Sequence, residues 1–343
     1  HRIARRQRQM CIRDSPNAWV GLESVSDDLS RAVVSVSSPK IPGSLYIYNA
    51  EKRELAAFRQ RYPGLAASQL AEVHEIAYPA RDGLTIPAYL TLPHGLSPES
   101  ADKLPFVVLP HGGPHARDFR RFDWMAQMLA DEGYGVIQMN FRGSTGYGVA
   151  FEKAGRKQWG DVMLNDINDA TRWLVDNALA EPSRICIVGE VFGGYAAMMS
   201  AVKHPDLYEC AASLNGISDL YSAVAEGRRY VGAFYFRRHI GRLWERKELD
   251  RNSPINKQMR KAVPLMLTAS EQNRIVSPKQ SRRMYNALKK SNNPVEFVEL
   301  PQGDHFLSRE ENRQSFAQAL LRFLDEHLGK PYQQLAQAIS SSQ

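Results

Sequence analysis

The sequence GEVFG at residues 189–193 has the layout of a catalytic turn, but its central residue is inert. A short apolar run at 185–188 breaks into glycines and continues into a stretch rich in Ala and Met. A strand that turns sharply into a helix between such glycines exposes the central side chain, and a serine there acts as a nucleophile. Here the central residue is Val191, which cannot attack a carbonyl, carry a proton or bind a metal. The segment predicts a nucleophile turn without its nucleophile.

A glycine-rich segment upstream predicts hydrogen-bond donors for a developing negative charge. The sequence HGGP at 111–114 follows directly after the apolar run that ends near Leu109. Glycines let backbone N–H groups approach a substrate oxygen closely, which is how an oxyanion hole is built. We predict that Gly112 and Gly113 line such a hole and that the N–H of Phe192 completes it. The alternative is a plain turn between a strand and a helix.

Two further segments fall where the partners of a nucleophile belong. The loop after the apolar run at 264–269 carries Asn273 at the position for a triad acid. His305 follows the run at 295–300 and is the predicted base. A lone histidine is structural more often than catalytic, but this one follows the appropriate strand. The predicted triad positions are therefore Val191, Asn273 and His305, of which only His305 keeps a catalytic side chain.

Glu190 adjoins the inert turn and is the nearest candidate for a substitute base. A carboxylate that points away from the pocket or pairs locally is the simpler interpretation, and we prefer it.

The elements that must position these residues alternate between strand and helix. Short apolar runs lie at 106–109, 135–140, 185–188, 210–214, 264–269 and 295–300. Between them, apolar residues recur at spacings of three and four, as at Met163, Ile167, Ala170 and Leu174 and again at Phe316, Leu320, Phe323 and Leu324. This alternation predicts an α/β fold whose mostly parallel sheet carries helices on both faces.

The region before these runs is predicted to be β-rich. Two short strands at 32–36 and 44–48 flank a Pro-Gly turn at 42–43. Two such strands do not form a stable sheet alone, so they must rest on other structure. The runs 73–78 and 84–92 then flank Asp-Gly at 82–83, which predicts a hairpin.

Composition excludes several classes of protein. The chain has 343 residues, 43% of them hydrophobic and 24% charged, which is ordinary for a globular protein. No apolar run of 18 residues is present, so we expect no membrane-spanning segment. Cys186 and Cys210 lie in apolar runs and are expected to be buried free thiols. We expect no cofactor and no metal.

The first fifteen residues differ from the rest of the chain. They contain five arginines and one aspartate, which contribute +4 to the formal net charge of +7. They do not contain the apolar core that a signal peptide requires. The string RRQRQMCIRDS resembles translated sequencing-adapter sequence. We expect residues 1–15 to be a non-native segment, and draw no nucleic-acid partner from their charge.

A second basic stretch is interleaved with aromatic residues. Between positions 228 and 247 lie Arg228, Arg229, Arg237, Arg238, Arg242, Arg246 and Lys247, among Tyr230, Phe234, Tyr235, Phe236 and Trp244. Such a pattern suits nucleic acid or an anionic surface. We prefer a helical insertion over the pocket mouth, with the aromatic side chains packed inward and the arginines solvated. Salt-dependent binding of single-stranded DNA would reverse this preference.

Several motifs together resemble one family. They are HGGPH (111–115), NFRGSTGYG (140–148), GGYAA (193–197), NGISD (215–219), SP (253–254) and GDH (303–305). Nearly the whole chain from 26 to 330 resembles the prolyl oligopeptidase family of serine peptidases, nearest its acylaminoacyl-peptidase branch. The resemblance implies an α/β-hydrolase catalytic domain that normally follows a β-propeller. It divides the chain into the last blade and linker (16–72), the peptidase domain (73–330) and a C-terminal tail (331–343), as expected of an N-terminally truncated copy.

The departures from that family fall on the chemistry. The family has Ser where this chain has Val191, usually Tyr where it has Phe192, and His-Gly-x-x-Asp where it has ASEQN at 269–273. We expect an oligopeptide or acyl-peptide hydrolase by descent that is catalytically inactive. The alternative is a non-catalytic binding or scaffold protein that retains an apolar pocket for a peptide or acyl-peptide ligand. Neither reading includes a nucleic-acid or membrane partner.

Overall fold

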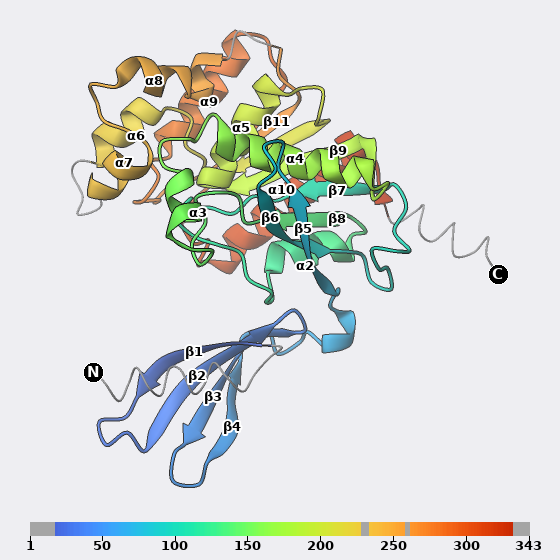
Figure 1. Cartoon of the computed structure of the whole chain (residues 1–343), viewed down its shortest axis with the longest axis vertical. Coiled ribbons are helices and arrows are strands. Elements are labelled where there is room, and N and C mark those ends of the chain that lie inside the picture. Colours follow the sequence, from blue (N-terminus) through green and yellow to red (C-terminus); the bar gives the residue numbers. More distant parts are fainter. Residues whose placement is uncertain (1–17, 228–232, 258–260, 332–343) are drawn as a thin grey trace, which may run out of the picture.

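Two separate β-sheets organise the chain. The structure is a computed structural model that describes residues 18–227, 233–257 and 261–331. A four-stranded sheet is formed by the first part of the chain, and an eight-stranded sheet with its helices by the remainder (Figure 1). The expectations for residues 1–15, for Arg228, Arg229 and Tyr230, and for most of the tail at 331–343 lie outside the described residues.

The large sheet is mostly parallel, as predicted. Its strands are β5 (Val73–Pro79), β6 (Thr85–Thr91), β7 (Leu104–Val108), β8 (Gly135–Met139), β9 (Ala180–Glu190), β10 (Cys210–Leu214), β11 (Leu265–Ser270) and β12 (Val295–Leu300). Their spatial order is β12-β11-β10-β9-β7-β8-β6-β5. The six strands from β12 to β8 run parallel, whereas β6 is antiparallel to β8 and to β5. The predicted hairpin is confirmed, with Gly83 at φ +86° in its turn.

Helices cover both faces of this sheet. They are α2 (Trp124–Asp131), α3 (Val149–Ala154), α4 (Val162–Asp176), α5 (Phe192–Lys203), α6 (Leu220–Gly227), α7 (Ala233–His239), α8 (Arg246–Arg251), α9 (Lys279–Lys290) and α10 (Glu310–Leu328), with short 3-10 turns η1 (Ala67–Gln69) and η2 (Pro254–Lys257). Buried side chains of α4, α5 and α9 share one apolar core, and those of α2 and α10 share another. Neighbouring strand residues divide between them: Val108 enters the first core and Val107 the second. This alternation places the sheet between two helical layers.

The first sheet has more strands than the sequence predicted. It consists of β1 (Trp19–Val25), β2 (Arg31–Ser38), β3 (Ile41–Asn49) and β4 (Glu54–Gln60), each antiparallel to the next. The turn between β2 and β3 lies at Pro39 and Lys40, so the predicted turn at 42–43 is wrong. Every residue of β4 is exposed, which explains why no apolar alternation marked it. One contact joins the sheet to the larger unit at Trp19 of β1, whose ring lies 5.5 Å from the Arg121 guanidinium. Just after β4, the Tyr62 and Phe122 ring centroids are 5.1 Å apart.

A buried ion-pair cluster fastens the hairpin to the helical layer. Arg142 donates to the carboxylate of Asp166 from Nε (2.7 Å) and Nη2 (2.7 Å), and its backbone N–H donates to the same carboxylate. Its guanidinium also pairs with Asp82 in the hairpin turn. Asp166 is fully buried, while Asp82 is partly exposed. The NFRGSTGYG segment therefore includes a structural tie as well as residues near the site.

Candidate active site

The predicted turn at Val191 is present with the geometry of a working one. Strand β9 ends at Glu190, helix α5 begins at Phe192, and Val191 between them has φ +53° and ψ −105°. This left-handed region is unfavourable for a β-branched residue and costs about 1–3 kcal/mol. Two hydrogen bonds hold the turn: the Val191 N–H donates to the carbonyl of Leu214 (3.1 Å), and its carbonyl accepts from the N–H of Tyr195 (3.0 Å).

Close packing of glycines explains why the turn keeps this conformation. A Cβ at Gly193 would lie 2.1 Å from the carbonyl oxygen of Pro110, and one at Gly189 would lie 2.4 Å from the backbone of Gly193. A Cβ at Gly194 would lie 2.6 Å from Ser213 Oγ. The surrounding backbone therefore dictates the turn, and the valine accepts its conformation instead of relaxing it.

The HGGP segment lies against the turn, as an oxyanion loop must. The position of a Cβ on Gly112 would be 3.5 Å from Val191 Cβ. Within the described residues, the N–H groups of Gly112, Gly113 and Phe192 have no protein acceptor. Three donors on two adjoining segments agree with the predicted oxyanion hole. The Phe192 ring is fully buried, packed between Phe141 and Trp159.

His111 orders this loop from within. Its Nδ1 lies 2.7 Å from the carbonyl oxygen of Gly112, which can only accept, so Nδ1 carries the proton. Its Nε2 lies 2.8 Å from Ser144 Oγ and accepts from that hydroxyl, and the ring stacks on Phe141 at 4.3 Å. Burial lowers the pKa of His111 to about 4, so the ring is neutral at pH 7. The sequence did not reveal Ser144 as the partner of His111.

We expect this buried histidine to make stability depend on pH. Its pKa is lower when folded than the ordinary 6.5, so the unfolded chain binds more protons and the contribution to stability falls as pH drops from about 6.5 towards 4. The loss is about 2 kcal/mol between pH 7 and pH 5. In urea unfolding, the stability gap between the parent and His111→Gln should shrink by about that amount. A gap that stays constant over this range, as expected for the exposed-site control His94→Gln, would contradict it.

The remaining triad positions meet at the ends of β11 and β12. His305 Nδ1 lies 3.2 Å from Asn273 Oδ1, and since an amide oxygen only accepts, Nδ1 is the donor. The Asn273 oxygen also accepts from the backbone N–H groups of Ile275 (2.9 Å) and Val276 (2.9 Å). Burial lowers the pKa of His305, opposed by the nearby negative charge of Asp304. The structure thus brings His305 and Asn273 together in the base–acid arrangement that the sequence predicted.

The surroundings of Asn273 suit a carboxylate better than an amide. Its oxygen receives three donors, whereas its buried Nδ2 has no hydrogen-bond partner. Turning the amide over would aim its NH₂ at two backbone N–H groups, so the orientation is fixed by the network. An aspartate would place acceptors on both sides and lose the orphaned donor.

Glu190 does not form the local pair that was one of its two expected interpretations. Within the described part of the chain its carboxylate has no hydrogen bond or ion pair, and its Cγ lies 3.6 Å from the place of a Cβ on Gly112. Part of the side chain reaches solvent, yet lost solvation around the carboxyl, with a smaller contribution from Asp123, raises its pKa to about 7. The expectation of a locally paired carboxylate is therefore not met. The residue lies beside the oxyanion loop.

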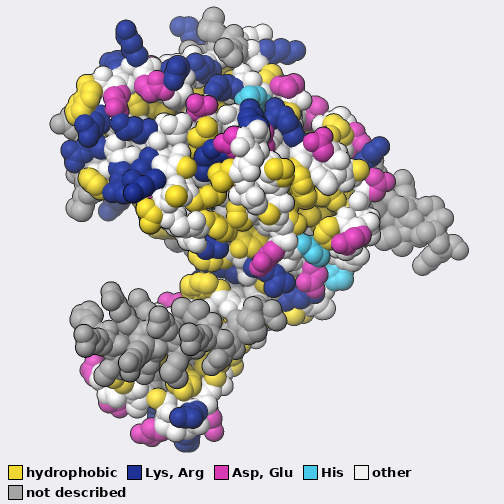
Figure 2. Space-filling view, viewed as in Figure 1, with side chains coloured by type: hydrophobic (Ala, Val, Ile, Leu, Met, Phe, Trp, Pro, Cys, Tyr) yellow, Lys and Arg dark blue, Asp and Glu magenta, His cyan; other side chains and the backbone are white. Residues whose placement is uncertain are grey.

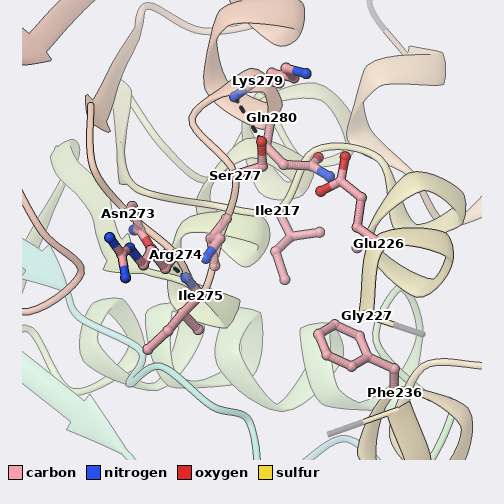
Figure 3. Close-up of a pocket in the computed structure, with 12 residues that line it drawn as sticks. Ile217, Glu226, Gly227, Phe236, Asn273, Arg274, Ile275, Ser277, Lys279 and Gln280 are labelled. Atoms are coloured by element: carbon pink, nitrogen blue, oxygen red, sulfur yellow. Dashed lines mark hydrogen bonds between the residues drawn. The ribbon is translucent and has the colours of Figure 1, made fainter. Parts of the chain in front are cut away.

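A cavity of about 580 Å³ adjoins the acid position. Asn273 and Val276 line it from the loop that follows β11. Ile217 lines it from the segment after β10, and Ala223 and Phe236 line it from α6 and α7 (Figure 3). Its size is within the range of ligand pockets. No group of three His, Cys, Asp or Glu side chains among residues 18–227, 233–257 and 261–331 is arranged to hold a metal ion. In the same ranges, no helix is both long and apolar enough to cross a bilayer.

The basic segment forms an exposed surface next to this cavity. Figure 2 shows Lys and Arg side chains gathered over the region of α6, α7 and α8. Arg238 lies over the Phe234 ring and Arg242 over the Trp244 ring, at 5.7 Å and 5.1 Å. Phe234 and Trp244 are 62% and 75% exposed, so the expectation that all the aromatic side chains pack inward is wrong for these two. Their rings lie under guanidinium groups instead of in a core.

The strand order, the helical layers and the glycine turn at a strand end define an α/β-hydrolase fold with a β-rich N-terminal region. The chain belongs to the prolyl oligopeptidase family, whose model matches residues 120–331. The predicted family and fold class are thereby confirmed.

Named relatives include peptidases of two kinds. The chain is 29% identical over 310 residues to dipeptidyl aminopeptidase BIII of Pseudoxanthomonas mexicana, covering 87% of this chain and 44% of that protein. It is 28% identical over 254 residues to the acylamino-acid-releasing enzyme of Homo sapiens, covering 72% and 34%. The chain spans less than half the length of these relatives.

Solved structures share the fold. A puromycin-hydrolyzing peptidase of Mycobacterium tuberculosis superposes with a TM-score of 0.79 at 28% identity, over 88% of this chain and 46% of that one. The acylaminoacyl peptidase of Pyrococcus horikoshii has a TM-score of 0.78 at 23% identity, over 92% and 50%, and supports the fold alone.

Proposed function

We propose that this chain is a catalytically inactive member of the prolyl oligopeptidase family that binds a peptide or acyl-peptide ligand without cleaving it. The observation that carries the proposal is Val191 at φ +53°, an inert side chain in a preserved catalytic turn. Asn273 supports it independently, because the acid position has also lost its charge. The descent is that of an oligopeptide or acyl-peptide hydrolase.

The expected activity follows from what the site lacks. Asp→Asn in a triad costs up to about 10⁴-fold in kcat even with the serine present, in the reference case because the amide holds the histidine in the wrong tautomer. Here the Asn273 oxygen accepts from His305 Nδ1, so the loss comes from the missing negative charge. Loss of the nucleophile is at least as severe, and an oxyanion hole with binding alone supplies about 10³–10⁴ over water. A water molecule would need a base, and Asn273 cannot stabilise an imidazolium at His305 as a carboxylate would.

The retained function is ligand binding. The cavity beside Asn273 is open to solvent, has both apolar and polar walls, and is lined from three separate parts of the fold. Val191 replaces a reactive side chain at the turn with an apolar one, which favours holding a ligand there over reacting with it. We propose a peptide or acyl group as the occupant and no nucleic-acid or membrane partner. Salt-dependent binding of single-stranded DNA would contradict the proposal that the protein has no nucleic-acid partner.

The test combines turnover with binding. We expect no hydrolysis of aminoacyl-naphthylamides or p-nitrophenyl esters above a buffer blank, together with a rise in the unfolding temperature when N-acylated peptides are added. The variant Glu190→Gln serves as the control for a carboxyl group that adjoins the turn and has a raised pKa. Turnover that disappears in Glu190→Gln or in His305→Ala would show that the site still works and would overturn the proposal.

A further inference from the structure

The cavity next to the acid loop contains an unpaired acidic side chain. Its lining is mixed. Ile217, Ala223, Phe236, Ile275 and Val276 form an apolar part, and the polar or charged residues are Glu226, Asn273, Arg274, Ser277, Lys279 and Gln280. Glu226 of helix α6 lines the same cavity, and in the view of Figure 3 its side chain extends from the helix towards Gln280. Within the described residues, Glu226 has neither a hydrogen bond nor an ion pair. Among the residues that the structure describes, Glu226 is therefore a carboxylate without a partner, beside the apolar part of the cavity.

Among the described residues, the other polar side chains that line the cavity form no hydrogen bond or ion pair with Glu226. The Gln280 amide is already engaged, since its oxygen accepts from the N–H groups of Ser218 and Asp219 and its NH₂ donates to Ser222 Oγ. Arg274 and Lys279 also line the cavity, but Figure 3 shows both side chains directed away from its centre. Neither forms an ion pair with Glu226.

The apolar wall opposite is held in place by close packing. The Phe236 ring lies against Gly227, where a Cβ would be 2.5 Å from the ring. Ile217 and Val276 are buried. An elongated side chain entering the cavity would therefore meet a fixed apolar surface along its stem and a carboxylate at its end.

We propose that this cavity binds a basic side chain, lysine or arginine, of the peptide ligand, with the aliphatic stem against Phe236 and the cation on Glu226. This inference rests on the proposed function, because it specifies the ligand of the same site. Lysine and arginine pack their methylene groups on apolar surfaces while their charged group stays in a polar environment. A guanidinium matches a carboxylate with two parallel hydrogen bonds.

The experiment compares ligands that differ in charge alone. Binding of N-acetyl-arginine amide is measured by calorimetry on the parent chain at low ionic strength, beside N-acetyl-citrulline amide, its neutral isostere. N-acetyl-norleucine amide reports on the apolar wall alone, and N-acetyl-glutamate amide reports on an anionic preference. We expect arginine to bind roughly tenfold more tightly than citrulline. In Glu226→Gln this ratio should fall to about one, with the affinity for norleucine unchanged.

A matched variant distinguishes the effect of the Glu226 charge in the cavity from the effect of the protein's overall charge. Glu209→Gln removes the same charge from an exposed turn outside the cavity and should leave the arginine-to-citrulline ratio intact. Equal binding of arginine and citrulline by the parent, or a preference for glutamate, would overturn the inference while leaving a peptide-binding function standing. Absence of binding by all four ligands would overturn the inference and the proposed function together.

Discussion

Restoring both lost side chains, in the variant Val191→Ser with Asn273→Asp, is expected to restore hydrolysis of N-acylated aminoacyl esters and naphthylamides. Three features support this expectation: the turn has φ +53° at position 191, His305 Nδ1 lies 3.2 Å from Asn273 Oδ1, and the N–H groups of Gly112, Gly113 and Phe192 have no protein acceptor within the described residues. The rate should exceed that of the parent by at least about 10³-fold. Steady-state kinetics on the purified variants is the measurement.

The two single reversions show how much of this gain in rate depends on each position. Val191→Ser alone should be slower than the double variant by about 10⁴-fold, because Asn273 cannot stabilise the imidazolium that forms on His305. Asn273→Asp alone should give no turnover, but it should raise the pKa of His305 through its negative charge, which a histidine titration by NMR would detect. Adding His305→Ala to the double variant should abolish the gain. A silent double variant would show that the pocket has diverged along with the chemistry.

Asp166→Asn is expected to cost about 3–5 kcal/mol of stability, because it leaves the Arg142 guanidinium buried without its main counter-charge. Asp166 is fully buried and accepts from Arg142 at 2.7 Å twice, whereas Asp82 holds the same guanidinium from a partly exposed turn. Urea unfolding of the two variants at pH 7 gives the comparison.

Asp82→Asn is the matched control for that measurement, since it makes the same chemical change on the same arginine. It should cost no more than about 1 kcal/mol, as exposed ion pairs do. Equal losses in the two variants would mean that burial does not decide the strength of this cluster.

Much of the larger unit could be predicted because its elements have strong periodic signals. The runs at 210–214 and 295–300 coincide with β10 and β12, and the spacing from Met163 to Leu174 lies within α4. Buried residues recur at regular spacing in these segments, so the pattern of apolar residues predicts the elements of the fold. The site positions followed because the glycine turn and His305 each lie directly after a strand.

The remainder depends on contacts that no local pattern encodes. Strand β4 is exposed at every residue, so its sequence ELAAFRQ has no buried face to mark it. The orphaned Nδ2 of Asn273 and the free carboxylate of Glu226 are consequences of three-dimensional packing between segments far apart in the chain. Their sequence contexts alone carry no sign of either.

The glycine-locked turn at residues 189–194 also bears on how such a protein can change over generations. Because backbone contacts dictate the turn, with a Cβ at Gly193 excluded by the Pro110 carbonyl, the side chain at position 191 contributes little to holding the architecture. Mutation at this one position can remove turnover while the folded molecule is inherited intact. A form without turnover would then remain available for selection on binding alone.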